Sequence, residues 1–213
     1  SSSNADTTRR AVAVVGFPDE AYPHAFRINS TSINAPSPDA FQVTYQNGEF
    51  ALQYERAAGG PVTSSFSVRV QGLVEWNDLG SGQVTSGEIV AVTPLGPSGF
   101  GVVPIEHSVT TAEDGVHLHT FVIRSDSRQV TLSLTIADGF VAMPHGGTLT
   151  PMEAELTIGL AHTMLENETR LSLQLAVTTS QRLLFENHSW DEQNHFSQNE
   201  RAINVTNDGG PNP

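Results

Sequence analysis

The chain has 213 residues, no cysteine, and 23 acidic residues against ten basic ones, all arginine, giving a net charge of -13. The absence of cysteine excludes disulfides, thiolate metal sites and thiol nucleophiles. The negative charge argues against nucleic acid and anionic lipid as partners, because both are bound through clustered cations. No apolar run approaches the roughly 18 residues of a membrane span, so no membrane insertion is predicted.

The composition of the surface predicts the location of the protein. Charged residues make up only 15% of the chain, so Ser, Thr, Asn and Gly must cover much of its surface. Such a surface is typical of secreted and cell-surface β proteins, and we predict an extracellular or cell-surface location. The acceptor pattern N-x-[ST] marks four candidate N-glycosylation sites, at Asn29, Asn167, Asn187 and Asn204.

Alternating apolar and polar side chains predict strands along most of the chain. In chain order, the predicted strands cover residues 11–15, 25–28, 41–45, 49–54, 66–76, 89–93, 101–105, 116–123, 130–136, 155–160 and 171–177. In the long strand, Gly72 is expected to form a bulge or bend. Short strands separated by Gly- and Pro-rich loops predict an all-β, antiparallel β-sandwich of jelly-roll or immunoglobulin-like type.

We predict one sandwich domain over residues 1–186 and an irregular polar tail over 187–213, because the periodicity ends after Phe185. Residues 1–17 include the apolar run RRAVAVVGF, for which two interpretations stay open. It is either an ordinary edge strand or a donor strand that pairs with the sheet edge of a neighbouring copy.

A Gly-, Ser- and Asp-rich loop follows the long strand and ends at Glu88. Gly82 and Glu88 match positions six and twelve of the calcium-loop pattern, whereas three other positions do not match. The loop offers Asp78, Glu88 and Glu75 as carboxylates, and calcium needs six or more oxygens. The favoured interpretation of this loop is a hairpin tip. The alternative is a calcium site at these three residues, which makes calcium the one candidate cofactor.

Two histidines lie on one face of the strand predicted at 116–123. His117 and His119 are two residues apart, so they share a face and could hold zinc or copper. A third ligand would have to come from Glu106, His107 or His145. The competing interpretation is cross-strand packing or hydrogen bonding of the imidazoles.

These patterns predict a non-catalytic module that acts as a structural or adhesive subunit of an extracellular assembly. One form of such an assembly is a homopolymer whose copies exchange strands. Its expected partners are copies of itself, other extracellular proteins or glycans. Two alternatives stay open. One is a metal-dependent or carbohydrate-active enzyme centred on His117 and His119; the other is a carbohydrate-binding module that uses Trp190 as an exposed ring.

Overall fold

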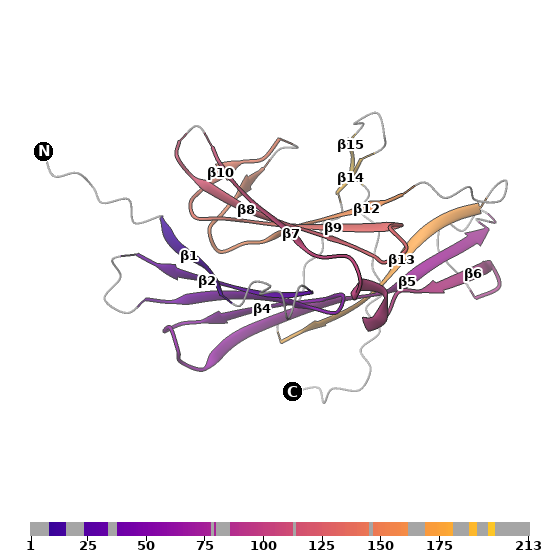
Figure 1. The fold of residues 1–213 in the computed structure, drawn as a ribbon, viewed down its shortest axis with the longest axis horizontal. Helices are drawn as coiled ribbons and strands as arrows, with labels where there is room; N and C mark the ends of the chain where they lie inside the picture. The colour runs from indigo at the N-terminus through magenta and orange to yellow at the C-terminus, as the bar shows by residue number, and fades with distance from the viewer. Residues whose placement is uncertain are drawn as a thin grey trace, which may run out of the picture. The chain divides into compact units, whose positions relative to one another are not determined.

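The computed structural model describes residues 9–15, 24–33, 38–77, 79, 86–112, 114–144, 147–161, 169–180, 188–190 and 196–198. Their regular structure is almost wholly antiparallel β-sheet, and two sheets pack face to face (Figure 1), which confirms the predicted all-β sandwich. The finer jelly-roll or immunoglobulin assignment stays a prediction. The chain divides into one compact unit over residues 1–180 and a second over 181–213. The domain boundary at 186 stays a prediction.

The first sheet has seven strands. They are β1 (Arg10–Val15), β2 (Ala25–Ser32), β3 (Ala40–Gln46), β4 (Glu49–Glu55), β5 (Val62–Asn77), β6 (Ile89–Pro94) and β13 (Thr169–Thr179). Their order is β1-β2-β3-β4-β5-β13, and β6 pairs with the end of β5 beyond β4. Between β3 and β4, Asn47 and Gly48 both have positive φ, the backbone that a two-residue hairpin turn requires.

The second sheet has the order β12-β9-β8-β7. Its strands are β7 (Glu106–Thr111), β8 (His117–Arg124), β9 (Val130–Ala137) and β12 (Glu155–Leu160). A small hairpin of β10 (Val141–Ala142) and β11 (Thr148–Leu149) follows β9, and a 3-10 turn, η1 (Pro97–Phe100), precedes β7. No helix in the described ranges is long and apolar enough to span a bilayer.

The second unit contains a short antiparallel hairpin of β14 (His188–Trp190) and β15 (Phe196–Gln198).

The core lies between the two sheets of the first unit. Alternate residues of most strands point inward, as in β9, where every second residue from Val130 to Ile136 is fully buried. Phe26 of β2 and Phe121 of β8 stack across the interface with ring centroids 4.1 Å apart. Burying a side chain of this size stabilises the fold by about 1.5–3 kcal/mol.

A bulge at Gly72 changes which residues of β5 face the core. Gln174 lies opposite Gly72 while Leu175 lies opposite Val70, so β5 carries one extra residue, as the sequence predicts. Beyond the bulge, Leu73 joins the main core, whereas Val74 and Trp76 do not. The apolar alternation of this strand therefore changes face at the bulge, so Val74 and Trp76 do not share the face of Val68 and Val70.

The strand predicted at 101–105 is absent from the structure. Residues 101–103 form bends, and the strand in this region is β7, which begins at Glu106. Phe100 and Ile105 are both buried and anchor this connection to the core. Gly101 and Pro104 explain the difference, because glycine weakens a strand and proline has no N–H to donate to a ladder.

β1 lies at the edge of the first sheet, where it pairs with β2 of its own chain over Arg10 to Val15. Val12 and Val14 pack against the main core, and Arg10 is almost completely buried. Arg10 donates to the Ser30 hydroxyl at 2.9 Å and to the Ser30 carbonyl at 2.8 Å. These contacts hold β1 in place within this sheet.

Candidate functional site

Two imidazoles meet on the inner face of the second sheet. His107 Nε2 and His119 Nδ1 are 3.4 Å apart, and the two rings are nearly parallel, with an interplanar angle of 11°. The register places His107 opposite Phe121 and His119 opposite Val109, so the histidines are diagonal neighbours on adjacent strands. His119 shares its face of β8 with buried Phe121 and Ile123, and that face points toward the first sheet.

Stacking fixes the orientation of these rings. His107 lies on Phe121 with centroids 4.4 Å apart, and Phe121 in turn stacks on Phe26. The four rings, Phe26, Phe121, His107 and His119, form a column that runs from the first sheet to the edge of the second. Their mutual contacts restrict the motion of both imidazoles.

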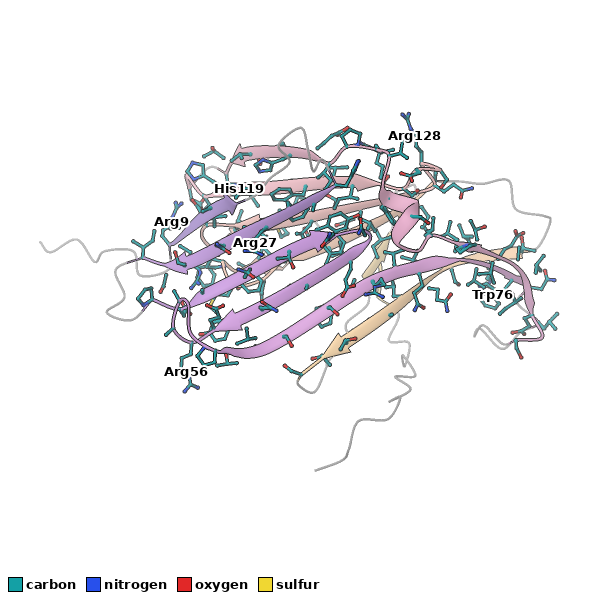
Figure 2. All side chains as sticks on the ribbon, turned by 60° about the horizontal axis from the view of Figure 1, so that its bottom comes forward. Arg9, Arg27, Arg56, Trp76, His119 and Arg128 are labelled. Atoms are coloured by element: carbon teal, nitrogen blue, oxygen red, sulfur yellow. The ribbon has the colours of Figure 1, made fainter. Side chains whose placement is uncertain are left out.

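His117 shares a face with His119, but its ring is bound elsewhere. Its Nδ1 lies 2.7 Å from Asp138 Oδ2, and its backbone N–H donates to Asp138 Oδ1 at 2.9 Å. Arg9 Nη1 donates to the same Oδ1 at 3.0 Å, so Asp138 joins β8 to the residue that precedes β1. Figure 2 labels Arg9 and His119 at the same end of the sandwich.

Burial changes the protonation of the histidine pair. It lowers the pKa of His107 and of His119. The neighbouring His107 lowers the His119 pKa further, while Asp138 acts in the opposite direction. The pair therefore favours neutral imidazoles, each of which carries one ring N–H and one ring nitrogen lone pair.

The other candidate metal ligands do not complete a site around the pair. Glu106 accepts a hydrogen bond from Arg124 Nη1 at 2.6 Å, and His145 lies outside the described residues. In the part of the chain that the structure describes, no three His, Cys, Asp or Glu side chains are arranged to hold a metal ion.

The candidate calcium loop connects β5 to β6 as a hairpin. Asn77 donates its backbone N–H to the Glu88 carbonyl at 2.8 Å, which closes the loop. Glu88 is 6% exposed and accepts from the Leu79 N–H at 3.4 Å, while Glu75 accepts from the Thr169 hydroxyl at 2.7 Å. Asp78 lies outside the described residues, and calcium binding stays a prediction.

Of the four sequons, only Asn29 lies in the described part of the chain; Asn167, Asn187 and Asn204 lie outside it. Asn29 is on β2, where its Oδ1 accepts from Gln42 Nε2 at 2.9 Å. Glycosylation stays a prediction at all four positions.

The two tryptophans give no exposed aromatic surface in the described structure. Trp76 is buried; it donates to the Ser172 hydroxyl at 2.8 Å, and the Arg170 guanidinium lies over its ring. It lies at the opposite end of the sandwich from Arg9 and His119 (Figure 2). Trp190 is in β14, paired with Phe196, and its side chain is outside the described part.

A cleft of about 680 Å³ lies on strands β2 to β5 of the first sheet. Its charged groups are Arg27, Arg69 and Glu49, and Arg69 Nε donates to Glu49 Oε2 at 2.8 Å. Both arginines stay protonated, and Glu49 already accepts from Arg69, so the lining offers charged groups that can bind polar ligands. Sequence reasoning missed the cleft because four strands must assemble to form it.

The strand β6 is exposed along its whole length. Ile89, Val90 and Val92 are 41%, 45% and 52% exposed, and β6 carries no charged residue. It pairs with β5 on one side, and no described strand pairs with its other side. The sequence predicts the strand but not its exposure, which depends on where the second sheet ends.

Fold and geometry define an antiparallel β-sandwich with an exposed apolar edge strand and an inward-facing histidine pair. Comparison of the chain with protein-family models, curated proteins and solved structures finds no match.

Proposed function

We propose that the chain is a non-catalytic, extracellular or cell-surface β-sandwich module that acts by contact, as a structural or adhesive subunit that associates with copies of itself. The observation that carries this proposal is the exposed, uncharged edge of β6. Edge strands of monomeric proteins are ordinarily protected by charge, by a bulge or by a covering segment, because their free N–H and C=O groups pair with other strands. β6 has a bulge at Val90, where its register against β5 shifts, but it carries no charge, and it presents Ile89, Val90 and Val92 to solvent.

A second copy of the chain suits this edge for two reasons. Antiparallel pairing of β6 with itself about Ala91 would place Val90 opposite Val92 of the other copy and form a two-fold interface. Facing β-branched pairs stabilise such ladders by about 0.2–1 kcal/mol each. The strand also lacks charge in a chain whose net charge is -13, so local repulsion at the contact is small.

The same net charge predicts how association depends on salt. Two copies repel each other at low ionic strength, and salt screens this repulsion beyond about 8–10 Å at physiological concentrations. Association through an uncharged apolar edge is therefore expected to strengthen as salt is added.

The edge strand β1, which the sequence offers as a donor strand, is less suited to exchange between copies. Its Arg10 is buried and bound to β2, and its valines already fill the core of their own sheet. Transfer of β1 to a neighbour would require all these contacts to break first. The proposal therefore assigns the intermolecular contact to β6.

Light scattering of Val90→Lys tests the proposal, with Val62→Lys as the matched control. Both valines are 45% exposed and lie in the first sheet, but Val62 is at the start of β5. The wild type and Val62→Lys should form larger particles as salt and protein concentration rise, while Val90→Lys stays monomeric. A wild type that stays monomeric, or equal disruption by both variants, would contradict the proposal.

A further inference from the structure

The cleft on strands β2 to β5 lies on the outer face of the first sheet. Its volume of about 680 Å³ is within the usual range of small-molecule sites. Arg27, Thr44 and Ala51 are direct neighbours across β2, β3 and β4, and they alternate with buried residues of these strands. The short side chains of Thr44 and Ala51 leave space between Arg27 on one side and Arg69 of β5 on the other.

Arg27 is an exposed cation that has no hydrogen-bond or ion-pair partner in the described structure. The other charged groups of the lining, Arg69 and Glu49, are already paired, with Arg69 Nε donating to Glu49 Oε2 at 2.8 Å. Two arginines and one glutamate give the lining a net charge of +1, in a chain whose net charge is -13. One uncompensated guanidinium matches a ligand with one carboxylate, because the two groups form a pair of charge-assisted hydrogen bonds.

Polar groups beside the arginines match a ligand that also carries hydroxyls. Gln46 and Asn47 line the cleft with amide groups, which both donate and accept, as hydroxyls do. Glu49 Oε1 accepts from no described residue, so it remains available to a ligand hydroxyl. The same carboxylate repels ligands with several negative charges, which favours a single-charge ligand over a polyphosphate or a polysulfate.

The turn between β3 and β4 holds this side of the cleft in place. Gly48 donates its N–H to the Tyr45 hydroxyl at 3.1 Å, and its carbonyl accepts from the Val70 N–H at 3.0 Å. The turn is therefore bonded both to β3 and to β5. Polar groups that are already ordered before a ligand arrives reduce the entropy lost on binding.

We propose that this cleft binds a sugar acid, with the ligand carboxylate on Arg27 and the ligand hydroxyls on Gln46, Asn47 and Glu49. The rings of Phe26 and Tyr45, which also border the cleft, are buried in the core, so neither is available to stack on a sugar. Binding therefore depends chiefly on the carboxylate. The site is separate from the proposed contact of β6, which pairs with β5 only from Gly72 onward.

The experiment is an NMR titration of the isotope-labelled full chain with methyl glucuronide, followed through the backbone amides of Thr44 and Ala51. Methyl glucoside is the matched neutral probe, because it has a hydroxymethyl group in place of the carboxylate. Acetate supplies a carboxylate without the sugar. At equal salt, methyl glucuronide should bind saturably, and both other probes should bind at least about tenfold more weakly.

Arg27→Gln should reduce the affinity for methyl glucuronide by at least about tenfold, to that for methyl glucoside. Arg56→Gln is the control, because Arg56 is also exposed but follows the end of β4 opposite to Glu49, outside the cleft. Figure 2 labels both arginines. Arg56→Gln should bind as the wild type does, and so should Val90→Lys, which separates this site from association through β6.

The amide spectrum of each variant away from the cleft shows whether it keeps the wild-type fold. Three results would overturn the proposal. They are the absence of saturable binding of methyl glucuronide to the wild type, equal affinity for methyl glucuronide and either other probe, and a loss in Arg56→Gln as large as that in Arg27→Gln.

Discussion

Arg10 and Asp39 form an ion pair at the edge of the first sheet, with Arg10 Nη1 2.8 Å from Asp39 Oδ1. Arg10 is 6% exposed and Asp39 20%. The Tyr54 hydroxyl donates to the other oxygen of Asp39 at 3.0 Å, and the Ser30 hydroxyl, which accepts from Arg10, donates to the Pro151 carbonyl. This network ties β1 to β2, to the residue before β3, to β4 and to the segment before β12.

Replacement of Arg10 should destabilise the fold. Arg10→Met removes a buried guanidinium and its bonds to Asp39 and Ser30, and we expect the free energy of unfolding to fall by about 1–3 kcal/mol. Urea denaturation measures the change. Arg27→Met is the control, because Arg27 is exposed on the adjacent strand and its loss should change stability by less than about 0.5 kcal/mol. Equal effects of the two variants would show that the ion pair is not stabilising.

Asp39 should make the fold sensitive to acid. Burial raises its pKa, but hydrogen bonds involving Arg10, Ser32 and Tyr54, together with the Arg10 charge, outweigh burial and lower it. The folded-state pKa is thus below the unfolded value of 3.8, so the contribution is present above about pH 4 and lost as pH falls through the folded pKa. The stability difference between the wild type and Asp39→Asn should therefore shrink between pH 6 and pH 3; a constant difference would contradict this linkage.

Phe121 is the central ring of the stacked column and is fully buried. Phe121→Ala leaves a cavity between Phe26 and His107 and should lower the free energy of unfolding by about 3–5 kcal/mol. Phe140 is 48% exposed, so Phe140→Ala should cost much less. Denaturant midpoints of the two variants provide the comparison, and similar losses would argue against the packing described for the column.

The histidine pair should make stability fall as the pH drops below about 6.5. Burial lowers the pKa of both rings in the folded state, so the unfolded chain binds protons more readily between the folded and unfolded pKa values. Their contribution is complete above the unfolded value of about 6.5 and is lost as pH decreases through the folded values. His117 and Asp138 also influence His119. Wild type measured in chelator should lose more stability from pH 7.5 to pH 5 than the His107→Phe, His119→Phe double variant; an equal loss would show that the pair is not responsible.

Local patterns in the sequence were sufficient to predict most strands and the bulge. The alternation over 130–136 and 155–160 corresponds closely to β9 and β12, because one face of each strand packs on the core and the other does not. The bulge at Gly72 was predictable, because a glycine within an alternating strand pattern indicates a bulge or bend. In the structure, a Cβ at this position would lie 2.8 Å from the Thr93 carbonyl oxygen. Its effect on the side-chain alternation of β5 was not, because that depends on pairing with β13, about a hundred residues later.

The candidate sites depend on contacts that local patterns do not encode. The strand pattern identifies His119 as a candidate ligand and leaves His107 as one of several possible neighbours. The nitrogens of these two residues come together only through the register of β7 against β8. Arg10 and Asp39 are separated by 29 residues and meet only when β1 pairs with β2. The free edge of β6 could likewise not be predicted, because the sequence of a strand does not show which of its two sides lacks a partner strand.

Amide hydrogen exchange of residues 89–93, measured at low and at high protein concentration in moderate salt, tests the central claim most directly. If β6 pairs with β6 of a second copy, the amides that point away from β5 should become protected at high concentration, and Val90→Lys should abolish that protection. Fast exchange of these amides at every concentration in the wild type would contradict the account.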